Sequence, residues 1–227
     1  MRFYINVLLF SFLLAVASCG SNNEKKKEKV ENEVSQKEPE KVEKQNNIIF
    51  FGNSLTAGYG VESEEAFAGL TQKRLDSLSY EYNVINAGVS GETTASGLSR
   101  VEWVVKRQPV DIFVLELGGN DGLRGIKPEE TDKNLRAIID KVRSIHPEVK
   151  ILLAGMMVPP NMGQAYAEEF QKIFPKIAED KNVNLIPFLL KDVGGEAELN
   201  LPDGIHPTPE GHKIVAETVW KNLKPLL

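Results

Sequence analysis

The sequence contains one cysteine, Cys19, and only three histidines among its 227 residues. A single cysteine excludes an intrachain disulfide, a cysteine-rich metal site and redox chemistry that needs a second thiol. The few histidines leave a short list of candidates for chemistry that depends on an imidazole. The sequence also lacks a glycine-rich loop with the lysine of a phosphate cradle, and no cluster of His, Asp or Glu has the spacing of metal ligands. We therefore predict neither a cofactor nor a bound metal.

The chain has fewer basic than acidic residues. It has 27 lysine and arginine residues against 32 acidic residues, and its formal net charge is −5. Proteins that bind nucleic acid present a basic surface, because they must neutralise phosphates. The charge balance therefore argues against nucleic acid as a partner.

The apolar run near the N-terminus, residues 7–16, is too short to span a bilayer and is typical of a secretory signal peptide. Val16-Ala17-Ser18-Cys19 follows, and a small-residue stretch that ends in cysteine resembles the signal of bacterial lipoproteins. We predict a signal peptide over residues 1–18 and lipidation of Cys19. The protein would then be lipid-anchored in the bacterial cell envelope, either periplasmic or exposed at the surface. The alternative is an ordinary secretory signal with an incidental cysteine.

Residues 19–46 have no aromatic side chain and are rich in lysine and glutamate, whose charges cancel. Such a segment cannot bury enough apolar area to offset the entropy lost on ordering. We predict a flexible, charged tether that spaces the folded domain from the membrane. The remaining residues, 47–227, suffice for one compact domain with a sizeable core.

Short apolar segments alternate with longer segments of helical pattern. The predicted strands are 47–51, 83–86, 111–117, 150–154 and 184–186, and the predicted helices are 64–78, 94–106, 128–145, 163–180 and 208–223. Near-continuous apolar strands are typical of a parallel sheet that is covered by helices on both faces. The alternation predicts an α/β fold, a three-layer α/β/α sandwich around a doubly wound, parallel, five-stranded sheet.

Polar and glycine-rich clusters follow three of the predicted strands. They are Gly52-Asn53-Ser54, Asn86-Ala87-Gly88-Val89-Ser90-Gly91-Glu92-Thr93 and Gly118-Gly119-Asn120-Asp121. The carboxyl ends of parallel strands meet at one edge of the sheet, where ligands bind in such folds. We therefore expect the three clusters to converge on one site.

A carboxylate precedes an imidazole by three residues in Asp203-Gly204-Ile205-His206-Pro207. An aspartate that orients a histidine forms part of a hydrolytic triad, which still requires a nucleophile. Ser54, in the first polar cluster, is the candidate. Each residue also has a plainer explanation, because serine often caps a helix and aspartate often shapes a turn. Those explanations are plausible one by one, but they do not explain why all these residues occur together.

Four sequence blocks together resemble the SGNH, or GDSL-type, hydrolases. They occur in the order that this family shows: Gly52-Asn53-Ser54-Leu55, Ser90-Gly91-Glu92-Thr93, Gly118-Gly119-Asn120-Asp121 and Asp203-Gly204-Ile205-His206-Pro207. The run from Glu116 to Gly125 looks most like the arylesterase, thioesterase and lysophospholipase branch. The resemblance spans nearly all of 47–227 and implies a flavodoxin-like SGNH hydrolase fold.

The resemblance implies a role for each of five residues. Ser54 would be the nucleophile, His206 the base that takes its proton, and Asp203 the carboxylate that orients the imidazole. The backbone N–H groups of Ser54 and Gly91 and the side-chain amide of Asn120 would form the oxyanion hole. One residue departs from the family pattern, since Asn53 stands where the family usually has Asp. We expect activity to survive this change with a shifted pH profile.

The resemblance further implies a carboxylic ester hydrolase that acts through an acyl-enzyme on Ser54 and accepts aryl esters, acyl thioesters or lysophospholipids. Leu55, Leu123, Pro160 and Ile205 are the candidate residues for contact with an apolar acyl group. The expected partners are the ester or lysolipid substrate and, through Cys19, a membrane. We expect a monomer. Two alternatives stay open at this point: a carbohydrate O-deacetylase of the same fold, and a binding module without catalytic activity.

Overall fold

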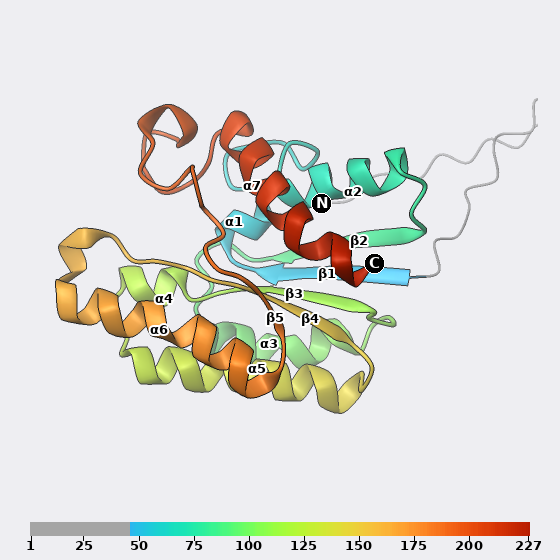
Figure 1. Cartoon of the computed structure of the whole chain (residues 1–227), viewed down its shortest axis with the longest axis horizontal. Coiled ribbons are helices and arrows are strands. Elements are labelled where there is room, and N and C mark those ends of the chain that lie inside the picture. The colour runs from blue at the N-terminus through green and yellow to red at the C-terminus, as the bar shows by residue number, and fades with distance from the viewer. Residues whose placement is uncertain (1–45) are drawn as a thin grey trace, which may run out of the picture. The chain divides into compact units, whose positions relative to one another are not determined.

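The computed structural model describes residues 46–227 of the chain. Five parallel strands form one sheet, as predicted, and the structure shows their order to be β2-β1-β3-β4-β5 (Figure 1). Their bounds are β1 Asn46–Gly52, β2 Tyr82–Gly88, β3 Ile112–Glu116, β4 Lys150–Ala154 and β5 Asn184–Ile186. β1 therefore begins one residue before the predicted start of the domain. The predicted signal peptide and residues 19–45 of the predicted tether, Cys19 among them, lie outside the described residues.

Helices cover both faces of the sheet and complete the predicted three-layer sandwich. α3 (Thr94–Val105), α5 (Pro128–Ile145) and α6 (Gln164–Lys181) pack side by side on one face (Figure 1). α2 (Phe67–Ser77) and α7 (Pro209–Leu223) pack together on the other face. The fold prediction is therefore confirmed.

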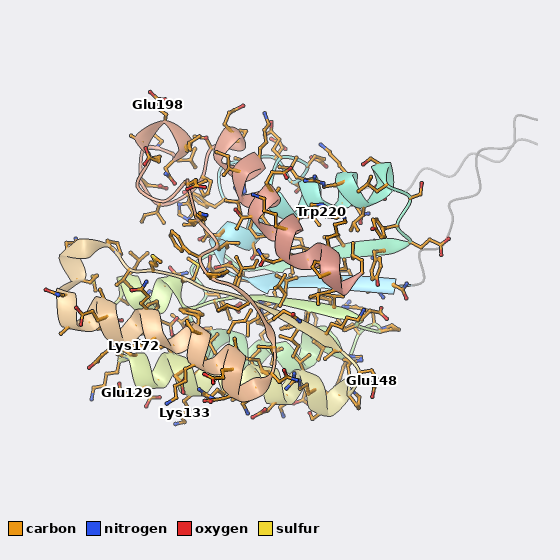
Figure 2. The ribbon with its side chains drawn as sticks, viewed as in Figure 1. Glu129, Lys133, Glu148, Lys172, Glu198 and Trp220 are labelled. Carbon is orange, nitrogen blue, oxygen red and sulfur yellow. The ribbon has the colours of Figure 1, made fainter. Side chains whose placement is uncertain are left out.

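The core lies between these layers and on both faces of the central strands. Residues 48–51 of β1 and 112–115 of β3 are fully buried, which explains why these strands read as continuous apolar runs. Charged side chains such as Glu129, Lys133 and Lys172 stand on the outer surfaces of α5 and α6 (Figure 2). Each helix thus turns one apolar face to the sheet and one polar face to water.

Two short helices, α1 (Ser54–Ala57) and α4 (Gly119–Leu123), follow the ends of β1 and β3. The sequence did not predict them, because helices of four and five residues are too short to show a periodic pattern. α2 begins at Phe67 instead of residue 64, because residues 62–66 form a hydrogen-bonded turn. No helix within residues 46–227 combines the length and the apolar character needed to cross a membrane.

His212 joins the two helices that share one face of the sheet. Its side chain lies on α7, is 1% exposed and accepts the backbone N–H of Phe67, the first residue of α2, at its Nδ1 atom. Ala66, at the N-cap of α2, has no side chain that could do so. The contact satisfies one of the donors that a helix leaves free at its start. Burial, and to a lesser degree the charge of His206, lower the pKa of His212 from 6.5 to about 4.

We expect this histidine to make the fold sensitive to acid. A lowered folded-state pKa contributes stability that is present above the unfolded pKa of 6.5 and is lost as the pH falls towards 4. The loss of unfolding free energy should reach about 3 kcal/mol. His212→Asn keeps a neutral acceptor and has no ionisable group. Denaturant unfolding of both proteins between pH 7 and 4 should show a flatter curve for the variant, and parallel curves would contradict this role.

Candidate active site

A tight turn carries Ser54 out of the sheet. β1 ends at Gly52, Asn53 caps the next helix by accepting the backbone N–H of Leu55 at 2.9 Å, and Ser54 is the first residue of α1. A Cβ on Gly52 would lie 2.2 Å from Thr56 Oγ1 and 2.5 Å from Glu116 Oε2, so no side chain fits there. Only glycine allows the turn to pack this closely against β3.

The structure brings Ser54, His206 and Asp203 into one chain of hydrogen bonds. Ser54 Oγ lies 2.8 Å from His206 Nε2, and His206 Nδ1 lies 2.7 Å from Asp203 Oδ2. With Nδ1 donating to the carboxylate, Nε2 is free to accept the serine proton. The ring of Tyr59 packs against the imidazole with centroids 4.5 Å apart. The geometry is that of a nucleophile, a base and an orienting carboxylate.

The loop that carries His206 also keeps the carboxyl group of Asp203 ionised. The second oxygen of Asp203 accepts the backbone N–H groups of Ile205 and His206, at 2.9 and 3.0 Å. These bonds, together with the contact to the imidazole, lower the pKa of Asp203 to about 2. Asp203 therefore stays ionised throughout the range in which His206 can act as a base, and it can stabilise the imidazolium that forms.

Backbone donors for an oxyanion come from two different loops. Gly91 follows β2 with a φ of +79°, a conformation that glycine adopts without strain. A Cβ at this position would meet no protein atom closer than 3.8 Å, so the requirement for glycine comes from the backbone angle. The N–H of Gly91 has no partner among the described residues, and the N–H of Ser54 begins α1, where helices leave donors free.

The side chain of Asn120 is the third predicted donor and lies on α4 after β3. One hydrogen of its amide is donated to the carbonyl oxygen of Glu92 at 3.1 Å. This bond fixes which end of the amide faces the loop after β2 and leaves the second N–H hydrogen available. The amide of Asn120 therefore has a fixed orientation and one N–H that can bind an oxyanion.

Three further residues hold the loops that carry these donors. Arg124 Nη2 donates to the carbonyl oxygen of Gly91 at 2.9 Å. Asp121, which is fully buried, accepts the backbone N–H of Thr94 at the start of α3 at 2.9 Å. Arg100 donates at 2.9 Å to Ala87 on β2 and pairs with Glu92. Asp121 and Arg124 therefore hold the loops around the site through these bonds.

Glu116, the last residue of β3, contacts the nucleophile turn and is not among the site residues that the sequence predicts. It is 1% exposed, and its Oε1 atom accepts the side-chain amide of Asn53 at 2.7 Å. Its Oε2 atom accepts the backbone N–H of Asn53 at 3.1 Å and the hydroxyl of Thr56 at 2.8 Å. Burial raises the pKa of Glu116 to about 7, although its hydrogen bonds act in the opposite direction. The signal was present in the sequence, since Glu116 ends an otherwise apolar strand.

The predicted substrate contacts fall into different environments. Leu123 and Ile205 are 39% and 41% exposed; Leu123 ends α4, which also carries Asn120, and Ile205 lies on the loop between Asp203 and His206. Leu55 is only 5% exposed and packs within the core cluster, so its contact with a substrate stays a prediction. Its position on the first turn of α1 directs it inwards, because Asn53 fixes that turn. The side chain of Pro160 lies outside the described residues.

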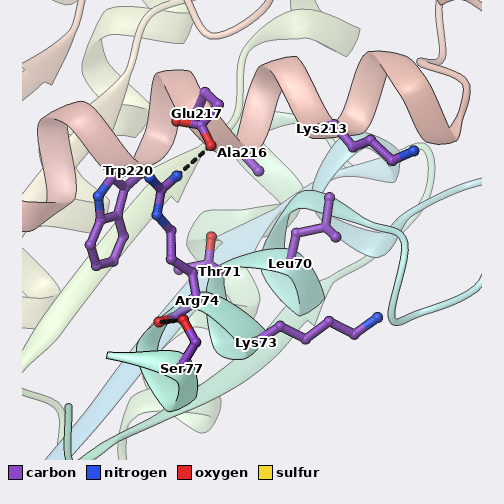
Figure 3. A pocket seen from close by; sticks show the side chains of 9 residues that line it. All are labelled: Leu70, Thr71, Lys73, Arg74, Ser77, Lys213, Ala216, Glu217 and Trp220. Atoms are coloured by element: carbon purple, nitrogen blue, oxygen red, sulfur yellow. Dashed lines mark hydrogen bonds and ion pairs between the residues drawn. The ribbon is translucent and has the colours of Figure 1, made fainter. Parts of the chain in front are cut away.

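A surface groove of about 390 Å³ lies between α2 and α7, away from this site. In Figure 3, Arg74 on α2 reaches Glu217 on α7, and its guanidinium lies 4.8 Å from the ring centre of Trp220. The groove is lined by Leu70, Thr71, Lys73, Arg74, Ser77, Lys213, Ala216, Glu217 and Trp220. None of them belongs to the triad or to the oxyanion donors. Within residues 46–227, no three His, Cys, Asp or Glu side chains are grouped so as to hold a metal ion.

Comparison with known proteins gives the same assignment as the geometry. Residues 50–214 match the model of the GDSL-like lipase/acylhydrolase family. The chain belongs to this family. It is therefore a serine ester hydrolase by family, as its sequence blocks predicted.

Named relatives and solved structures are similar over most of the chain. Esterase TesA of Pseudomonas aeruginosa is 38% identical over 180 residues, which cover 79% of this chain and 89% of that protein. Thioesterase 1/protease 1/lysophospholipase L1 of Escherichia coli K12 is 35% identical over 180 residues, with coverage of 79% and 84%. The crystal structure of the psychrotrophic esterase EstA from Pseudoalteromonas sp., inhibited by monoethylphosphonate, superimposes with a TM-score of 0.75 at 30% identity and covers 79% of this chain and 97% of its own.

We expect Asn120→Ala to lower kcat by about 10²- to 10³-fold with little change in KM. The amide N–H binds charge that develops only in the transition state, and one such donor contributes that much to the rate. The measurement is steady-state hydrolysis of p-nitrophenyl butyrate. Asn134→Ala is the matched control, because Asn134 donates to Thr94 and contacts no group of the triad or oxyanion hole. Equal losses in both variants, or a change confined to KM, would contradict the assignment of Asn120.

Proposed function

We propose that this enzyme cleaves carboxylic esters, including lysolipids, through an acyl-enzyme formed on Ser54. The observation that carries the proposal is the continuous hydrogen-bond chain from Ser54 Oγ through His206 to Asp203, with distances of 2.8 and 2.7 Å. A serine hydroxyl needs a base within hydrogen-bond reach, and the base needs a partner that fixes its tautomer. Both requirements are met without movement of the loops.

The reaction follows from these positions. Ser54 Oγ attacks the carbonyl carbon of the ester while His206 Nε2 takes the hydroxyl proton. The carbonyl oxygen becomes negative and is met by the N–H groups of Ser54 and Gly91 and by the amide of Asn120. The bond to the leaving alcohol then breaks, and the imidazolium gives its proton to the leaving oxygen. A water molecule, deprotonated by His206, attacks the acyl-enzyme in the same way and releases the acid.

The substrate class is inferred from the exposed surface and from the relatives. Leu123 and Ile205 are exposed apolar side chains on the segments that carry Asn120 and His206, which suits an acyl chain better than a sugar. Relatives that are named esterase, thioesterase, lysophospholipase and arylesterase support the same class. Activity on acyl thioesters is therefore also proposed.

We expect Ser54→Ala to lower the kcat of ester hydrolysis by about 10⁶-fold, because the nucleophile is lost. Ser99→Ala is the matched control, since Ser99 lies exposed on α3 and bonds only to the backbone of Ser96 among the described residues. The assay is hydrolysis of a p-nitrophenyl ester series from acetyl to long acyl chains. Full turnover by Ser54→Ala would refute the nucleophile. Parent activity confined to acetyl would favour the O-deacetylase, and no parent activity would favour a binding module.

For localisation we propose that the protein is held in the bacterial cell envelope by a lipid on Cys19. The support is the apolar run at residues 7–16 followed by small residues and the cysteine, and the charged segment 19–46 that would separate the enzyme from the membrane.

We expect Cys19→Ala to release the protein from the membrane fraction of expressing bacteria. The modification requires the thiol of Cys19, and the chain has no second cysteine that could replace it. The measurement is fractionation followed by blotting, with Ser18→Ala as the matched control beside it. Unchanged membrane retention of the Cys19 variant would remove the proposed anchor.

A further inference from the structure

Glu116 is a buried carboxylate with all of its hydrogen-bond partners on one short segment of the chain. The three donors that contact it are the backbone N–H and side-chain amide of Asn53 and the hydroxyl of Thr56. These groups lie on either side of Ser54 in the chain. Glu116, at the end of the central strand β3, thus bonds to the residues on both sides of Ser54. His206 contacts the hydroxyl of Ser54 itself.

The strand register makes this contact close. Glu116 on β3 lies opposite Gly52 on β1, and its Oε2 atom occupies the space that a Cβ at residue 52 would fill. A buried carboxylate with no such donors would be costly. Here its three bonds are made, and no charged side chain among the described residues contributes to its pKa. The three hydrogen bonds of Glu116 therefore all come from the turn that carries Ser54.

We propose that Glu116 is a positioning residue for Ser54, and that it acts by fixing the orientation of the Asn53 amide. The inference rests on the hydrolase function proposed above. Because Asn53 Nδ2 donates to Glu116, the Oδ1 atom must face the other way, where it accepts the backbone N–H of Leu55 at 2.9 Å. The same Oδ1 atom lies 3.5 Å from Ser54 Oγ.

When Glu116 is ionised, two repulsive contacts disfavour the opposite orientation of the amide. A rotated Asn53 would point its oxygen at the Glu116 carboxylate and its NH₂ group at the N–H of Leu55. Glu116 thereby fixes the helix cap and places an acceptor, not a donor, next to the serine hydroxyl. The hydroxyl can then direct its proton to His206 Nε2 at 2.8 Å, the nearer of its two acceptors.

The test exchanges the amide at position 53 and the carboxylate at position 116. Asn53→Asp places two carboxyl groups in contact, and Glu116→Gln places two amides in contact. The double variant, Asn53→Asp with Glu116→Gln, exchanges the two groups. The amide introduced at position 116 would donate its NH₂ to the carboxylate introduced at position 53. Its oxygen would still accept the backbone N–H of residue 53 and the Thr56 hydroxyl.

The experiment measures kcat and KM for a soluble short-chain ester, and the rate at which a p-nitrophenyl phosphonate labels Ser54. Each single variant should lower kcat and the labelling rate about ten-fold at unchanged KM, in line with coupling between groups in contact. The double variant should recover most of both losses. Circular dichroism and thermal unfolding show whether each variant is folded.

The pH profile separates positioning from a merely structural role. In Asn53→Asp the ratio of kcat to that of the parent should fall as the pH rises above neutrality, because the two carboxyls can share a proton only at lower pH. The double variant has one carboxyl and should show no such fall. Along the hydrogen-bond chain, the next titratable group is His206, which lies beyond Ser54 and is present in every variant.

Three results would overturn the inference: single variants with parental kcat and labelling rate, a double variant no better than the weaker single variant, or a flat pH ratio for Asn53→Asp.

If a single variant does not fold, Thr56→Val removes one donor to Glu116 and should slow labelling about two- to three-fold. Thr71→Val is its control, because the buried Thr71 hydroxyl bonds only to the Phe67 carbonyl among the described residues, and an equal effect in both variants would also overturn it. Failure of the parent to hydrolyse any ester would instead refute the proposed function.

Discussion

The catalytic arrangement depends on the close approach of the end of β1 to the end of β3. At that contact Gly52 lies opposite Glu116, and the volume that any larger residue would need is filled by a carboxylate and a hydroxyl. The chain can therefore reverse sharply and start α1 with Ser54 in its first position. A second close approach, where a Cβ on Gly88 would lie 2.3 Å from the backbone of Ala57, presses α1 against β2. Backbone packing, rather than any catalytic group, thus sets where the nucleophile lies.

The other catalytic groups reach the nucleophile on separate loops, and polar contacts between these loops keep them in register. The loop after β2 is held by Arg124 through the carbonyl of Gly91, and by Asn120 through the carbonyl of Glu92. Asp121 connects the loop after β3 to the start of α3. The bonds from Arg124 and Asn120 use carbonyl oxygens of the loop after β2, and the N–H of Gly91 has no partner among the described residues, which is the polarity that binding of an oxyanion requires.

Much of the fold and of the active site could be predicted from the sequence, because the informative signals are local. Buried strands are continuous apolar runs, and residues 128–145 match the predicted helix at both ends. The contacts that depend on tertiary packing could not be predicted. The capped turn places Leu55 in the core cluster, and strand register places Glu116 opposite Gly52, and neither position shows in the sequence pattern. The ring of Tyr59 reaches His206 from a distant part of the chain, which no spacing rule indicates.

The loop that carries both Asp203 and His206 is fastened to its surroundings by a few backbone contacts. The carbonyl of His206 accepts the N–H of Leu201 at 2.7 Å, and Pro207 forms an isolated bridge with Asn200. Acid and base therefore stay paired even when the loop shifts as a unit, while their distance to Ser54 changes. A local opening of this loop would therefore abolish activity while the sheet stays folded, because loops open at a lower free energy than buried strands.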